Sequence, residues 1–292
     1  SVEGSDDPFK QMPVPGNNGI IITSSVNDSS ITLQWAKGSD DITSQKNLEY
    51  RVYSSKANNI GNAAEAMNNG SPVTGWYVNT SQAMAETLDK GTAYYFNVVI
   101  RDADNNVSAY KTTSARTRGV IYIFSVGHNK GNMVTMTASS AREELNNICA
   151  ERKEEKYPDL QAASVVAFIS ISETDAIKNF PAVHGVPMDW PVKSPDGTLV
   201  AYSWDDLVDG TINRGLYQAG VISWVEEDDD IAWWSGSTAD GGYDAGYTCN
   251  GWTNGTAEYR GRTGDGEAIG NTWISGGPPA CSSTHELICI CW

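Results

Sequence analysis

The segment Ile31-Thr-Leu-Gln-Trp35 alternates apolar and polar residues at a period of two. This is the period of a β-strand that has one face in a core and the other in water. Two more runs of strand character follow, Tyr50-Arg-Val-Tyr53 and Tyr95-Phe-Asn-Val-Val-Ile100, and clusters of Gly, Asn, Asp or Ser bound each run. Short strands at this spacing predict a β-sandwich domain over residues 14–118.

Two segments fall outside this strand pattern. Residues 59–69 are rich in Ala, which predicts a short helix or a loop turn before a strand near Trp76. Residues 1–13 are mostly polar, and we expect a flexible N-terminal segment there. The chain begins without Met, so removal of a signal peptide or lipoprotein leader is one interpretation and a trimmed chain is the other.

The stretches SSITLQWAKGSDD, LEYRVYSS and TLDKGTAYYFNVVIRDADNNVSAY together resemble a bacterial fibronectin type III domain. The resemblance implies that Trp35 packs in the sandwich core. It also implies that Leu88, Thr92 and Tyr94 form a corner in which the Tyr hydroxyl bonds back to the backbone. The expected role of such a domain is that of a spacer, because a fold alone does not confer a function.

A second domain is expected from residue 119 onward. Residues 119–126 predict a strand, and the capping-box spacing of Ser140 and Glu143 predicts a helix that turns Cys149 toward the core. Residues 165–171 form a buried-strand run, and residues 194–212 combine a Pro-Asp-Gly turn, a strand and a short capped segment. From Trp224 on, 69 residues hold six Trp, four of the five Cys and many Gly, which predicts a long loop-rich region.

All five cysteines lie in this second half, at positions 149, 249, 281, 289 and 291. They form no paired C-x-x-C knuckles of the kind that hold structural zinc, so disulfides are the better interpretation. Disulfides persist in oxidising compartments, which predicts a periplasmic, cell-surface or extracellular protein. Because Cys289 and Cys291 point to the same side of a strand, only one of them can meet Cys149.

Residues 119–292 resemble a bacterial family of endostatin-like and C-type-lectin-like domains found on surface lipoproteins. The most specific motifs are Cys249-Asn-Gly-Trp252-Thr and the terminal Cys281-x5-Leu-Ile-Cys289. The resemblance implies the pairs Cys149–Cys289 and Cys249–Cys281, with Cys291 left over. It also implies that Trp252 and Trp273 pack beneath the loops. The predicted architecture is thus mainly β, with an α+β second domain.

Charge is concentrated in the second half. Residues 1–118 hold 10 Lys+Arg and 12 Asp+Glu, whereas residues 119–292 hold 10 and 24, which accounts for most of the net charge of −16. An acidic surface repels phosphate backbones and anionic headgroups, so nucleic acid and membrane surfaces are unlikely partners. No apolar run reaches the roughly 18 residues of a membrane helix. A protein or neutral glycan from a host or the environment remains the expected partner.

The run Glu226-Glu-Asp-Asp-Asp230 is the densest charge cluster. Glu227, Asp228 and Asp230 are candidate calcium ligands, and Asp228, Asp229 and Asp230 are candidate contacts to a basic partner. A solvated acidic loop is the alternative, since most charge runs are exposed faces without a ligand. The chain lacks the Glu-Pro-Asn, Gln-Pro-Asp and Trp-Asn-Asp motifs of calcium-dependent sugar-binding lectins. The expectation is therefore no cofactor, with calcium as the alternative.

Trp233, Tyr243 and Tyr259 are the aromatic contact candidates, because they stand in loop-like stretches rich in Gly and Ser. Catalysis has little support, since His128, His184 and His285 lie in no known catalytic motif. We therefore expect a non-enzymatic surface adhesin or secreted binding protein that contacts its ligand through the second domain's loops. A structural cell-envelope component and a hydrolase with an accessory sandwich are the alternatives.

Overall fold

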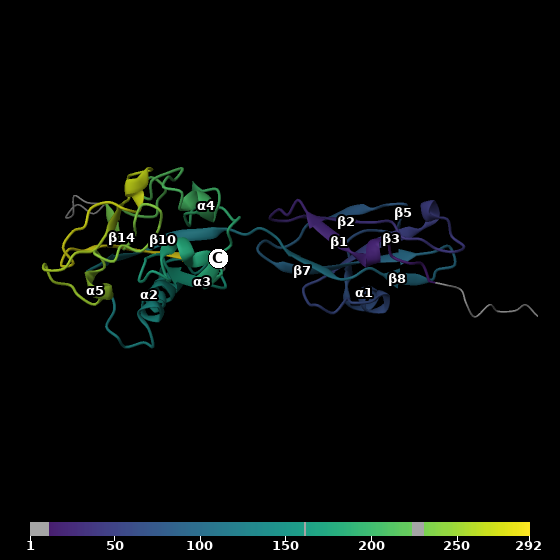
Figure 1. Ribbon diagram of the computed structural model, residues 1–292, viewed down its shortest axis with the longest axis horizontal. Helices are drawn as coiled ribbons and strands as arrows, with labels where there is room; N and C mark the ends of the chain where they lie inside the picture. Colours follow the sequence, from purple (N-terminus) through teal and green to yellow (C-terminus); the bar gives the residue numbers. More distant parts are fainter. Residues whose placement is uncertain (1–11, 161, 224–230) are drawn as a thin grey trace, which may run out of the picture. The chain divides into compact units, whose positions relative to one another are not determined.

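The computed structural model describes residues 12–160, 162–223 and 231–292. The chain divides into two compact units, and the boundary falls after Gly119. The elements of the first unit are η1 (Asn17–Gly19), β1 (Ile21–Ser24), β2 (Ile31–Trp35), η2 (Gln45–Asn47), β3 (Glu49–Ser55), α1 (Ala63–Asn69), β4 (Ser71–Pro72), β5 (Tyr77–Val78), β6 (Gln82–Ala85), β7 (Ala93–Arg101), β8 (Val107–Ala109) and β9 (Thr113–Arg116) (Figure 1).

The first unit is a two-sheet β-sandwich. One sheet has the order β1-β2-β6, and the other has the order β4-β3-β7-β8 with β5 and β9 added at β3 and β7. Ile31, Leu33 and Trp35 of β2 are buried, whereas Gln34 is exposed, so the period-two pattern places one face of this strand in the core. Trp35 packs against Tyr50 and Tyr110 in that core, as predicted.

Helix α1 covers the outer side of the second sheet. Its Ala66 is fully buried with Tyr53 of β3, Val99 of β7 and Ile60. Asn62 caps the helix, because its side chain accepts a hydrogen bond from the backbone N–H of Glu65 at 2.9 Å. The Ala-rich segment is therefore a true helix that closes a second, smaller core.

The predicted tyrosine corner is present. The hydroxyl of Tyr94 accepts a hydrogen bond from the backbone N–H of Asp89 at 3.1 Å. Leu88 is half-buried against the sandwich core, and the backbone N–H of Thr92 donates to Thr117 Oγ1 at 2.9 Å. These bonds join the chain before β7 to β7 and to the segment that follows β9.

The second unit is a mixed sheet with helices and long loops. Its strands run in the order β13-β12-β10-β16-β14-β15, and β11 also pairs with β16. The elements are β10 (Ile121–Asn129), α2 (Ala141–Lys156), β11 (Val165–Ala167), η3 (Ile177–Asn179), α3 (Phe180–His184), β12 (Val192–Lys193), β13 (Leu199–Ala201), α4 (Trp204–Leu207), β14 (Ala232–Trp234), α5 (Cys249–Trp252), β15 (Thr263–Asp265), η4 (Asn271–Trp273) and β16 (His285–Cys291).

Strand β16 lies between two cores, and all seven of its residues are buried. Ile288 and Ile290 face one core, while Leu287, Cys289 and Cys291 face the other. The last strand of the chain is therefore the centre of the unit, which explains its nearly continuous apolar sequence.

Helix α2 packs on the second of these cores. Leu145 and Cys149 are fully buried, and Ser140 caps the helix by accepting from the backbone N–H of Glu143 at 3.2 Å. Glu143 itself accepts from Ser139 rather than from the capping residue, so the predicted capping box is only half formed.

Two disulfides hold this unit, Cys149–Cys289 and Cys249–Cys281, and these are the pairs that the lectin-like resemblance implies. Cys291 is free and buried. Burial raises the pKa of its thiol to about 12, so the thiolate is scarce at neutral pH. The disulfides favour an oxidising compartment. None of the helices in the described ranges is long and apolar enough to cross a membrane.

Two predicted strand lengths were wrong. β10 continues to Asn129, into the expected loop, because it pairs with β16 as far as His285. The run predicted over 165–171 is a strand only as far as Ala167, since the backbone of Phe168 bonds to Ile288 beyond the regular ladder. In both cases tertiary pairing decides where the strand ends.

Candidate binding site in the loop region

The structure tests some of the predicted contact residues. Trp233 is fully buried and donates its indole N–H to the carbonyl oxygen of Trp273 at 2.9 Å, so its assignment as a contact residue was wrong. Its Gly- and Ser-rich surroundings suggested a loop, but residues 232–234 form β14 between β15 and β16. Trp252 is fully buried as predicted, and its indole donates to the carbonyl of Ser170.

The two tyrosines remain accessible. Tyr259 is 42% exposed, and Tyr243 is half-buried in a β-bridge with Ser237. The acidic run 226–230, with the calcium candidates Glu227, Asp228 and Asp230, lies outside the described residues. Within the described ranges, no group of three or more His, Cys, Asp or Glu side chains is placed to hold a metal ion.

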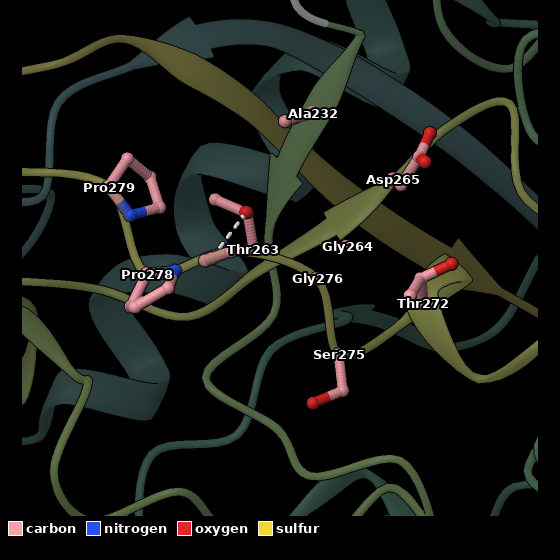
Figure 2. A pocket seen from close by; sticks show the side chains of 10 residues that line it. Ala232, Thr263, Gly264, Asp265, Thr272, Ser275, Gly276, Pro278 and Pro279 are labelled. Atoms are coloured by element: carbon pink, nitrogen blue, oxygen red, sulfur yellow. Dashed lines mark hydrogen bonds between the residues drawn. The ribbon is translucent and has the colours of Figure 1, made fainter.

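The loop region has its own pocket, a cavity of about 600 Å³. Figure 2 shows Asp265 and Thr272 on one side of it and Pro278 and Pro279 on the other. The lining is formed by β14, β15, η4 and the segment that leads to Cys281, and it consists of Ala232, Thr263, Gly264, Asp265, Thr272, Ser275, Gly276, Gly277, Pro278 and Pro279. Sequence reasoning singled out none of these residues; the available signal was the density of Gly and Pro in residues 275–279.

Backbone pairing holds the two walls of the pocket together. Thr263 donates its backbone N–H and its hydroxyl to the carbonyl oxygen of Gly277, at 3.1 and 2.8 Å (Figure 2). Gly276 donates back to the carbonyl of Thr263 at 2.6 Å. The guanidinium of Arg262 adds a bond to the carbonyl of Gly276 at 2.8 Å. Residues 276–277 are thereby docked beside β15 without forming a regular strand.

Glycine at position 264 is required by this close approach. A Cβ atom there would lie 2.1 Å from the carbonyl oxygen of Trp273 and 2.3 Å from Trp233 Nε1. Both distances are far below van der Waals contact, so the floor of the pocket tolerates no side chain at this position.

The neighbouring loop, residues 236–247, is held by ion pairs. Arg262 bonds to Asp244 at 2.9 Å, and its guanidinium lies 4.5 Å from the ring centroid of Tyr247. Asp240 accepts from Thr238 and from Lys178, and these bonds lower its pKa to about 2. Such bonds give a polar loop a defined shape without an apolar core of its own.

The turn at α5 explains the Cys-Asn-Gly-Trp motif. Cys249, Asn250, Gly251 and Trp252 all have left-handed backbone angles, with φ of 50°, 57°, 68° and 64°. A left-handed residue other than Gly costs roughly 1–2 kcal/mol, and Asn and Gly tolerate it best. The turn persists because Cys249 is bonded to Cys281 and Trp252 is buried. It joins the loop region to the core behind the pocket.

The pocket offers hydrogen-bonding groups. Thr272 and Ser275 supply hydroxyl groups, Asp265 supplies the one carboxylate in the lining, and the glycines expose backbone. One oxygen of Asp265 accepts from the backbone N–H of Glu267 at 2.9 Å, which fixes the side chain. Hydroxyl and backbone groups around a single carboxylate suit a neutral ligand with several polar groups.

Comparison with known proteins gives a partial picture. No protein-family model matches the chain, and no curated protein matches it. Solved structures with similarity include the fibronectin type III domain of human fibronectin type III domain containing protein 3, at 14% identity and a TM-score of 0.28 over 40% of this chain and 93% of that one. The FN1–FN3 domains of chicken CNTN1 share 18% identity, with a TM-score of 0.28 over 37% of this chain.

A third similar structure is a β-1,2-glucanase from Parabacteroides distasonis, with 18% identity and a TM-score of 0.26 over 37% of this chain. The matched regions span 33% of the CNTN1 chain and 14% of the glucanase chain.

Proposed function

We propose that this chain is a non-enzymatic, secreted or surface-displayed binding protein that recognises a protein or glycan through the loops of its second unit. The observation that carries the proposal is the pocket between Asp265 and Pro279, whose walls are fixed by backbone hydrogen bonds. A pocket that is formed before the ligand arrives avoids the entropy cost of ordering loops on binding.

We further propose a C-type-lectin-like fold for the second unit and a fibronectin type III fold for the first, which would act as its spacer. Three features support the lectin-like assignment: the pairing of the first and last strands of the unit, β10 and β16, the bond from α2 to β16, and the second bond within the loop region. The sheet orders and the tyrosine corner support the fibronectin-type assignment.

The chemistry of the pocket lining supports binding over hydrolysis. Glycosidases use two carboxyl groups that flank the bond to be cleaved, whereas this lining contains Asp265 alone. Hydroxyl groups and backbone carbonyls at fixed positions recognise polar ligands without transferring a proton.

A glycan and protein array, screened with and without calcium, tests the proposal. The wild-type chain is expected to bind a restricted set of ligands, and Asp265→Asn and Ser275→Ala are expected to weaken that binding about 2- to 10-fold, the effect of one hydrogen bond. Asp159→Asn, at an exposed acid away from the pocket, is the matched control and should bind as the wild type does. Silence of the array under both conditions would overturn the proposal.

A further inference from the structure

A second hollow, here called the α3–α4 groove, has a cavity of about 480 Å³. Its apolar lining consists of Pro181, Ala182, Val186, Met188, Trp204 and Val208, and it shares no residue with the lining of the loop pocket. The groove lies between two short helices of the second unit, which are labelled in Figure 1. It therefore offers a separate contact surface.

The groove exposes apolar side chains. Met188 is 51% exposed on its rim, and Ala182 is exposed on α3. Helix α3 has Pro181 in its first turn and ends at Gly185, whose φ of 72° is left-handed. A single exposed apolar residue is ordinary, but an exposed group around a hollow marks a contact site.

The floor of the groove carries an unpaired hydrogen-bond donor. Trp204 is only 1% exposed, and its indole Nε1 has no hydrogen-bond partner. The ring is fixed by Phe168 and Phe180, and the backbone N–H of Trp204 donates to the carbonyl of Met188 at 2.9 Å. A buried N–H without an acceptor is rare in folded proteins and is stabilised by any ligand oxygen that reaches it.

The charge around the groove is negative. Asp205 is exposed on the rim and has no ion-pair partner within residues 12–160, 162–223 and 231–292. Lys178, the cation on the rim, is already paired with Asp240 at 3.0 Å. Residues 120–292 as a whole contain 24 acidic and 10 basic side chains, so a basic partner is attracted to this face.

We propose that the α3–α4 groove binds an apolar side chain flanked by Lys or Arg in a partner protein. The apolar side chain fills the hollow between Pro181 and Val208, and a basic neighbour pairs with Asp205. A carbonyl oxygen of the partner accepts the Trp204 indole N–H. That nitrogen is closed to water in the empty groove, so this last bond requires a rotamer change in the lining, which the unbranched and exposed Met188 side chain permits.

Peptide titration of the full chain, followed by NMR of the tryptophan indole N–H signals, tests the proposal. The probe is a blocked pentapeptide with Leu between two pairs of Lys, and the Trp204 signal is assigned by its loss in Trp204→Phe. The Leu peptide is expected to shift the Trp204 signal, while a peptide with Ser in place of Leu leaves it unchanged. Asp205→Asn is expected to raise the Kd about threefold or more and to reduce its salt dependence, and Met188→Lys is expected to abolish the shift.

Asp159→Asn removes one exposed acid elsewhere in the unit and serves as the charge control. Both Met188 and Asp205 are surface positions, and a thermal melt of each variant verifies that it is folded. Three results would each overturn the proposal: no movement of the Trp204 signal at millimolar peptide, an equal response to the Ser peptide or to a Glu-flanked Leu peptide, or equal effects of Asp205→Asn and Asp159→Asn. Because this test uses a different surface and probe, its failure leaves the loop-pocket proposal standing.

Discussion

Trp233 and Trp273 meet at a hydrogen bond of 2.9 Å from the indole N–H of the first to the backbone carbonyl of the second. Their rings are 5.7 Å apart and also pack against Phe168. Through this contact, β14 in the sheet holds η4, and η4 carries Thr272 at the edge of the loop pocket. The stability of the core and the shape of the pocket are thus coupled at one pair of residues.

Trp233→Phe tests this coupling. The substitution keeps an aromatic ring but leaves the buried carbonyl of Trp273 without its donor, which costs about 1–3 kcal/mol. We expect the denaturant midpoint of the second unit to fall while that of the first unit stays constant. The two transitions can be followed by NMR signals assigned to each unit, and an unchanged second midpoint would show that the bond contributes nothing.

Gly264→Ala tests the close packing at the floor of the pocket. The added Cβ would overlap the carbonyl of Trp273 at 2.1 Å, so the strand or η4 must shift, and overpacking of this kind costs about 1–3 kcal/mol. Gly270→Ala is the matched control, because a Cβ there has no heavy atom within 4 Å and the position has an ordinary backbone conformation. Chemical denaturation of both variants should show a loss only for Gly264→Ala.

The Cys249–Cys281 bond closes a loop of 32 residues. In the chain-entropy model such a bond contributes about 4 kcal/mol, and the left-handed turn at α5 adds to the need for it. Replacing both cysteines with Ala should therefore lower the unfolding free energy of the second unit strongly. Non-reducing peptide mass spectrometry of the wild type should find Cys149 linked to Cys289, and a link from Cys149 to Cys291 would contradict the structure.

Trp35→Ala tests the independence of the two units. Removal of a buried Trp from a core costs about 3–5 kcal/mol, so the melting transition of the sandwich should fall steeply. The transition of the second unit should remain where it is in the wild type. Differential scanning calorimetry resolves the two, and a joint shift would mean that the units unfold as one.

Glu144 gives the second unit an acid-sensitive contact. Hydrogen bonds from the Thr135 side chain, the Thr137 side chain and the backbone N–H groups of Thr135 and Met136 lower the pKa of this carboxyl from 4.5 to about 2. The folded-state pKa lies below the unfolded one, so the stabilisation is present above about pH 4.5 and is lost as the pH falls toward 2.

Glu144→Gln should remove the part of the pH dependence that arises from this contact. Between pH 2 and 5 the unfolding free energy of the variant should rise less steeply than that of the wild type. Urea titrations at several pH values measure this slope for the second unit. Parallel curves for the two proteins would show that Glu144 does not carry the acid sensitivity.

Local patterns in the sequence determined much of the architecture. Alternation at Ile31–Trp35 predicts a strand with one buried face because side chains of a strand point alternately to its two sides, and the structure buries Ile31, Leu33 and Trp35. The cap at Ser140 and the Ala-rich helix before β4 were also readable, because capping and helix propensity act over a few residues. For the same reason, the placement of Cys289 and Cys291 on one strand face followed from spacing alone.

Only the tertiary structure decided which loop residues are accessible. Trp233 stands in a Gly- and Ser-rich stretch, yet it is buried because β15 and β16 pair on either side of it. The loop pocket arises because Thr263 and Gly277, 14 positions apart, bond to each other, and the α3–α4 groove arises because α3 and α4 lie side by side. Burial and concavity depend on contacts between distant segments, and sequence periodicity reports only the preferences of neighbouring residues.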